Sequence, residues 1–193
     1  SSGGGLADPD TDFNLVSALY DFDGTNGAIN TSMVDGSDTG HTVANGGGVH
    51  QSSFSPFAAD DGKWSYKFDR TTPDTVTIGA HQDLTFGTGD FTIEGWYYFT
   101  DDYSGGIGLW QTQSSVVGPS LGYYNFTGWQ VYHGATNNYS LFNNIAALVP
   151  GKWHHVAMVR ASSSLRIYLN GVSSVGNISD PTNYTTNTFT IGT

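Results

Sequence analysis

The chain lacks cysteine and is poor in basic residues. Without cysteine it has neither disulfides nor thiolate metal sites. Its 6 Lys and Arg residues stand against 17 acidic residues, giving a net charge of −11. Such a surface repels phosphate backbones, so we expect no nucleic-acid partner. No apolar run approaches the roughly 20 residues of a membrane-spanning helix, so we expect no membrane insertion.

Turn formers and strand formers make up much of what is present. The chain has 26 glycines, 14% aromatic residues and only 12% charged residues. This composition is typical of short strands joined by many turns, and no segment keeps a helical period for three turns. The 193 residues suffice for one β-sandwich domain. We expect residues 1–13, Gly-rich and then acidic, to form a flexible arm or linker, and residues 14–193 to form the domain.

Residues 151–172 predict a β-hairpin. The stretch from Trp153 to Arg160 carries apolar residues on both faces, as a central strand does. The stretch from Leu165 to Leu169 alternates as a half-buried strand does, and Ser162 to Ser164 make the turn. Shorter patterns predict further strands at residues 15–22, 64–68, 75–78, 91–99, 107–111, 121–125, 129–133, 139–142 and 189–192.

Several motifs carry a family resemblance. They are W-H-H-V-A at 153–157, L-R-I-Y-L-N-G at 165–171, L-T-F-G-T-G-D-F-T-I-E-G-W at 84–96, and the loops D-F-D-G at 21–24 and D-G-S-D-T-G-H at 35–41. Together they resemble the three-element laminin-G subgroup of the concanavalin A-like lectin/glucanase superfamily. The resemblance covers about Leu15 to Gly192 and implies an all-β, antiparallel jelly-roll sandwich.

Both ends of the chain suggest a larger context. The sequence opens with Ser rather than Met, so we expect a processed or shortened product or a piece of a longer protein. In the family, the strand matching residues 189–192 is followed by one more, which runs beside the first strand. Here the chain stops at Thr193. Either the domain is truncated or its sheet lacks the last strand and leaves an open edge.

Catalysis is not expected. Relatives that hydrolyse glycosides carry E-x-D-x-(x)-E on one strand, which brings two carboxylates within about 5–5.5 Å. Glu94 is the only glutamate of this chain, and the family uses that position structurally. His154 and His155 point to opposite faces of one strand, so they cannot bind one ion together.

The resemblance implies a non-catalytic recognition or adhesion module that binds glycans, on a phage virion or a bacterial extracellular surface protein. Sugar sites use aromatic rings against the apolar faces of pyranoses. The candidates are Trp110, Tyr123, Tyr124, Trp129, Tyr132 and Tyr139. Core packing competes with this role, because strand alternation buries about half of such rings. The alternative function is a structural subunit of a virion or extracellular filament that assembles with its neighbours by strand exchange.

Calcium is the metal that the loop at residues 35–41 would suit. It prefers carboxylate and carbonyl oxygens on irregular loops. Asp35, Asp38 and the carbonyls between them could supply these ligands, as the matching loop is thought to do in relatives. Asp23 is a third candidate, close in sequence. The competing interpretation is that these aspartates only cap turns.

Overall fold

Strands dominate the computed structural model. It describes residues 15–22, 24–29, 34–57, 64–69, 74–100, 105–112, 119–124, 127–133, 138–142 and 145–192, and of residues 138–142 the backbone alone. The strands are β1 (Val43–Gly46), β2 (His50–Ser52), β3 (Ser65–Lys67), β4 (Thr75–Ile78), β5 (Phe91–Tyr98), β6 (Gly106–Gln111), β7 (Ser120–Tyr124), β8 (Gly128–His133), β9 (Asn138–Phe142), β10 (Trp153–Ala161), β11 (Ser164–Leu169), β12 (Val172–Ser173), β13 (Ile178–Ser179) and β14 (Phe189–Ile191). A short 3-10 helix, η3 (Gln82–Leu84), precedes β5.

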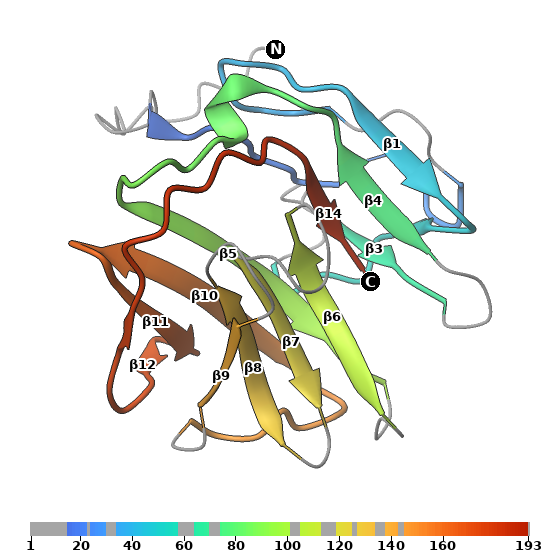
Figure 1. Cartoon of the computed structure of the whole chain (residues 1–193). Coiled ribbons are helices and arrows are strands. Elements are labelled where there is room, and N and C mark those ends of the chain that lie inside the picture. The colour runs from blue at the N-terminus through green and yellow to red at the C-terminus, as the bar shows by residue number, and fades with distance from the viewer. Residues whose placement is uncertain are drawn as a thin grey trace, which may run out of the picture.

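Two antiparallel sheets form the expected sandwich (Figure 1). One has the order β1-β4-β14-β6-β7-β8-β9, and the other has the order β12-β11-β10-β5, with β13 also pairing with β11. Strands β2 and β3 form a separate two-stranded ribbon. One hydrophobic core joins the sheets, because Trp110 and Val76 of the first belong to the same buried cluster as Met158 and Ile167 of the second. The all-β, antiparallel prediction is confirmed.

The predicted hairpin is confirmed in strand position and in turn. Strand β10 lies between β5 and β11, with Val156 opposite Leu169 on one side and Gly95 on the other. Ser162 and Ser163 have φ of 51° and 59°. Two consecutive turn residues with positive φ match the right-handed twist of the flanking strands.

The strand predicted at residues 15–22 is wrong. Phe22 has a φ of 57°, which breaks an extended run. The Leu19 amide donates to the Asp35 carboxylate, while Ala18 and Tyr20 pack against the core. This side-chain contact and single backbone hydrogen bonds, from the amides of Gly36 and Trp64 to the carbonyls of Leu19 and Asp21, hold the segment without a strand ladder. Among the described residues, β5 forms one end of the five-stranded sheet with β10 as its neighbour.

Residues 1–13, expected to form a flexible arm or linker, lie outside the described residues, so the arm stays a prediction. No helix in the described part of the chain has the length and apolarity to cross a membrane.

Candidate functional site

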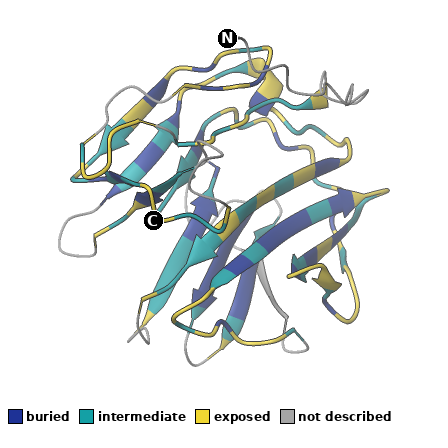
Figure 2. Cartoon of the chain, turned by 180° about the vertical axis from the view of Figure 1, so that it is seen from behind, coloured by how far each residue is buried: buried dark blue, intermediate teal, exposed yellow. Residues whose placement is uncertain are grey.

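An aromatic patch covers the outer face of the sheet where β5 and β10 meet. We define the patch as Phe54, Phe57, Trp96, Tyr98 and Trp153. Trp96 and Tyr98 lie on the same face of β5 because strand residues alternate. In the ladder Tyr98 is opposite Trp153, and Trp96 is opposite His155. Figure 2 shows how exposed positions recur along β5, whereas β10 is mostly buried.

The loop after β2 completes the patch. Phe54 stacks on Trp153, with ring centroids 5.2 Å apart and an interplanar angle of 27°, and meets the edge of Tyr98 at 4.7 Å. Phe57 meets Trp96 edge to face at 5.9 Å. Serines hold this loop, because Ser65 Oγ donates to the Phe54 carbonyl at 2.6 Å. Residues about 40 or more positions apart in the sequence thus form one surface.

The patch rings remain accessible to solvent. Phe54, Phe57 and Trp96 expose 50%, 42% and 45% of their surface. Exposed apolar surface is unfavourable by roughly 25 cal/mol per Å². Contiguous apolar surface of this kind marks interaction sites, whereas single exposed apolar residues are common. The patch therefore has the properties of a ligand platform.

Polar groups border the aromatic rings. The His155 Nε2 lies 3.4 Å from Glu94 Oε2, and its ring lies 5.2 Å from that of Trp96. The Glu94 side chain is mostly exposed. A carboxylate accepts hydrogen bonds and an imidazole can donate or accept them. Rings for stacking and hydrogen-bonding groups for hydroxyls therefore lie side by side.

Of the six aromatic residues predicted to bind glycan, the five with described side chains do not form one exposed cluster. Trp110 and Trp129 expose 1% of their surface and Tyr123 is also buried, so a sugar has no access to these rings. They lie on β6, β7 and β8, whose inward faces fill the core. Tyr124 and Tyr132 are half-buried, and the side chain of Tyr139 lies outside the described part of the chain. The prediction did not include Trp96 and Tyr98 of the aromatic patch, although alternation along β5 places these two residues on one face.

Asp35 caps the loop at residues 35–41. Its Oδ1 accepts from the amides of Leu19 and Ser37, each at 2.9 Å. Its Oδ2 accepts from the His41 amide at 2.9 Å and contacts His41 Nδ1 at 2.7 Å. A carboxylate has about four lone-pair sites, and all four are used here. Asp35 therefore has the bonding of a turn cap.

The three predicted calcium ligands do not form a common oxygen cage in the described residues. To bind an ion, Asp35 would have to give up one of its hydrogen bonds, such as that from the His41 amide. Asp38 is exposed, and Asp23 lies outside the described residues. Calcium binding at this loop stays a prediction, and the hydrogen bonds of Asp35 do not favour it.

Acid should remove the stabilisation that Asp35 contributes. Burial by itself raises the pKa of Asp35, but the amides of Leu19, His41 and Ser37 outweigh it and hold the pKa at about 2, below the ordinary 3.8. Because the folded-state pKa is the lower one, the contribution is complete above about pH 4 and is lost as the pH falls toward 2. The difference between the folded-state pKa and the ordinary pKa of Asp35 corresponds to roughly 2 kcal/mol in the free energy of unfolding.

Urea unfolding from about pH 5 to pH 2 measures this contribution. The variant Asp35→Asn should be less stable at the upper end of the range, and the difference from the parent chain should shrink as the pH falls. A difference that stays constant across the range would contradict the assignment.

Comparisons with known proteins agree with the architecture. The sequence profile described as the concanavalin A-like lectin/glucanases superfamily matches residues 70–193. No curated protein matches the chain. A crystal structure of the HCR/D F1240A mutant has a TM-score of 0.62 and 13% identity, covering 89% of this chain and 44% of the other. The present chain thus spans less than half of that protein.

Two further solved structures are similar. Domain 4 of AbnA, a GH43 extracellular arabinanase from Geobacillus stearothermophilus, was solved with arabinotriose; it has a TM-score of 0.52 and 11% identity over 82% of this chain and 76% of the domain. The carbohydrate-binding module CBM66 from Bacillus subtilis has a TM-score of 0.41 and 13% identity over 62% and 73%. Identities this low show the fold alone. The profile match covers most of the chain, which therefore belongs to the concanavalin A-like lectin/glucanase superfamily and has its antiparallel jelly-roll fold.

Proposed function

We propose that the chain is a non-catalytic carbohydrate-recognition module and that the aromatic patch is its binding surface. The observation that carries this proposal is the group of three half-exposed rings, Phe54, Phe57 and Trp96, on one sheet face. Rings of this kind stack on the apolar C–H faces of sugars. The Glu94–His155 pair beside Trp96 would hydrogen-bond to the hydroxyl groups.

The ligand class that best fits the surface is an oligosaccharide. The patch offers two groups of contacting rings on which successive sugars could stack, since Phe57 contacts Trp96 and Phe54 contacts Tyr98 and Trp153. The arabinanase domain with a similar fold was solved with arabinotriose, which supports this class. A phage virion or a bacterial extracellular surface is the setting we propose, since glycans would be met there.

The carboxylates near the patch support binding without hydrolysis. Glu94 is the only glutamate of the chain, and its cross-strand partner in the β5–β10 ladder is Ala157. A retaining glycosidase needs a second carboxylate about 5–5.5 Å away. The β10 side of Glu94 provides none, so a bound oligosaccharide should leave unchanged.

A glycan array probed with the labelled chain tests the function. We expect binding by the parent chain, loss of binding in the double variant Phe57→Ala/Trp96→Ala, and intact oligosaccharide in the eluate by mass spectrometry. The control is Tyr168→Ala, on the outer face of β11 in the same sheet. No binding by the folded parent chain, or equal binding by the double variant, would contradict the proposal.

The edge of β5 favours a second candidate function. Its eight residues end the five-stranded sheet, and the described residues supply only β10 as a neighbour. An open strand edge can accept a strand from another chain, so the domain could act as a structural subunit that assembles by strand addition. We expect concentration-dependent assembly under this function. A monomeric mass by light scattering across a concentration series would exclude it.

A further inference from the structure

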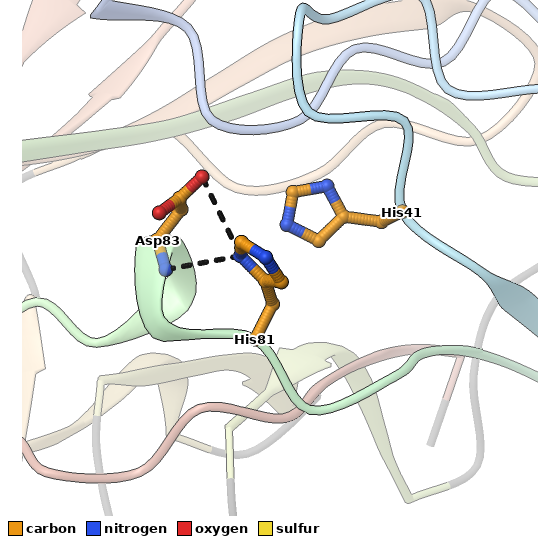
Figure 3. Close-up of side chains that lie close together, drawn as sticks. All are labelled: His41, His81 and Asp83. Carbon is orange, nitrogen blue, oxygen red and sulfur yellow. Dashed lines mark hydrogen bonds and ion pairs between the residues drawn. The ribbon is translucent and has the colours of Figure 1, made fainter.

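Three metal-ligating side chains converge at a second place in the fold. His41 follows the Asp35 loop, whereas His81 and Asp83 flank the start of η3 (Figure 3). One ligand atom of each residue lies within 4.8 Å of those of the other two. The site lies where the loop before β1 meets the connection from β4 to β5. It is distinct from the aromatic patch on the β5–β10 face.

His41 presents a free nitrogen to this cluster. Its side chain is 1% exposed, and its Nδ1 lies 2.7 Å from the Asp35 carboxylate. Because a carboxylate only accepts, the Nδ1 carries the proton, and the Nε2 of the neutral ring is left with its lone pair. This Nε2 is buried and has no hydrogen-bond partner. Figure 3 shows one ring nitrogen of His41 turned toward His81 and Asp83.

The other two side chains are held in place and remain open to solvent. The His81 Nδ1 accepts from the Asp83 amide at 3.3 Å and lies 3.4 Å from Asp83 Oδ2. That oxygen also accepts from the Thr39 hydroxyl at 2.8 Å. Both His81 and Asp83 are partly exposed, so an ion can enter and water can complete its coordination.

We propose that His41, His81 and Asp83 bind a divalent transition metal ion of the zinc class. Two imidazole nitrogens and one carboxylate oxygen suit zinc and its neighbours, whereas calcium prefers oxygen alone. Asp35 is the positioning residue, because its contact with Nδ1 fixes the tautomer and ring orientation of His41, as carboxylates commonly do behind metal-bound histidines. Bound metal ties the loop before β1 to η3.

Zinc titration of the chelator-treated full chain tests this site. We expect one ion per chain by calorimetry and an affinity lower by about tenfold or more in His81→Asn and in Asp83→Asn. The matched control is His50→Gln, a histidine on β2 outside the cluster, which should bind zinc as the parent does. Since His41 is buried, the partly exposed His81 and Asp83 carry the test, with circular dichroism to confirm that the variants fold.

A thermal readout separates zinc from calcium. Zinc should raise the melting temperature of the parent and of His50→Gln, and should have little effect on His81→Asn, because a ligand that binds only the folded state stabilises it. Calcium at the same concentration should leave the parent unchanged. Equal zinc affinity in the parent, His81→Asn and Asp83→Asn would overturn the proposal, as would a response to calcium with none to zinc.

Discussion

Replacing Arg160 by methionine should lower the free energy of unfolding by about 3–5 kcal/mol. The Arg160 side chain is completely buried, and so is its partner Asp180, whose Oδ2 lies 3.5 Å from Nη1. The substitution would leave Asp180 as an uncompensated buried charge. Breaking one half of a buried pair is far more costly than losing an exposed one.

Arg160 also satisfies backbone groups that a methionine cannot. Its guanidinium donates to the carbonyls of Gly87, Gly89 and Thr182 at 2.6–2.9 Å. It lies over the rings of Phe91 and Tyr184, 4.7 Å and 5.0 Å from their centroids. One side chain of β10 thus links the turn before β5 to the segment before β14.

Thermal and urea unfolding measure the loss. At about 2–4 °C per kcal/mol for a domain of this size, the melting temperature should fall by roughly 6–20 °C. The control is Arg166→Met, an exposed arginine on β11, which should change stability by about 0.5 kcal/mol or less. Similar losses in the two variants would show that the buried network does not stabilise the fold as described.

Replacing Trp96 by alanine should lower the affinity for the best array glycan by about tenfold or more, which is roughly 1.4 kcal/mol. Trp96 is 45% exposed, so it offers ring surface to a ligand while contributing little to the core. Stability should therefore change much less than affinity. Trp96→Phe keeps an aromatic face and should retain part of the binding.

Calorimetry with the purified oligosaccharide gives these affinities. Tyr168→Ala again serves as the control on the same sheet and should bind as the parent does. If Trp96→Ala lost affinity only in proportion to a loss of folded protein, the effect would be one of stability. Unchanged affinity in a folded Trp96→Ala variant would contradict the assignment of the aromatic patch as the binding surface.

The parts of the fold that could be predicted are those set by local patterns. In the hairpin, β10 has apolar residues on both faces, β11 alternates, and the turn has residues that accept positive φ. Residues 15–22 show the opposite case. Their apolar pattern resembles a strand, but their backbone is fixed by Asp35, 16 residues from Leu19. A local sequence pattern does not indicate a hydrogen-bond partner that lies so far away in the sequence.

Of the aromatic patch, only the part on β5 could be predicted from the sequence. Alternation places Trp96 and Tyr98 on one face, but the sequence does not say that this face is the outer one. The loop carrying Phe54 and Phe57 reaches this face through ring packing and a serine hydrogen bond that form only in the folded chain. The same holds for the metal cluster, since His41 and His81 are 40 positions apart and meet only in the folded chain.

Chemical-shift mapping of the five tryptophan indole N–H signals tests whether the aromatic patch binds carbohydrate. With the array-selected oligosaccharide, we expect the signal of Trp96 to move most, that of Trp153 to move less, and those of the buried Trp110 and Trp129 to stay in place. Assignment by Trp96→Phe identifies the first signal. Movement of the Trp110 or Trp129 signal, with that of Trp96 unchanged, would contradict the aromatic patch as the carbohydrate-binding surface.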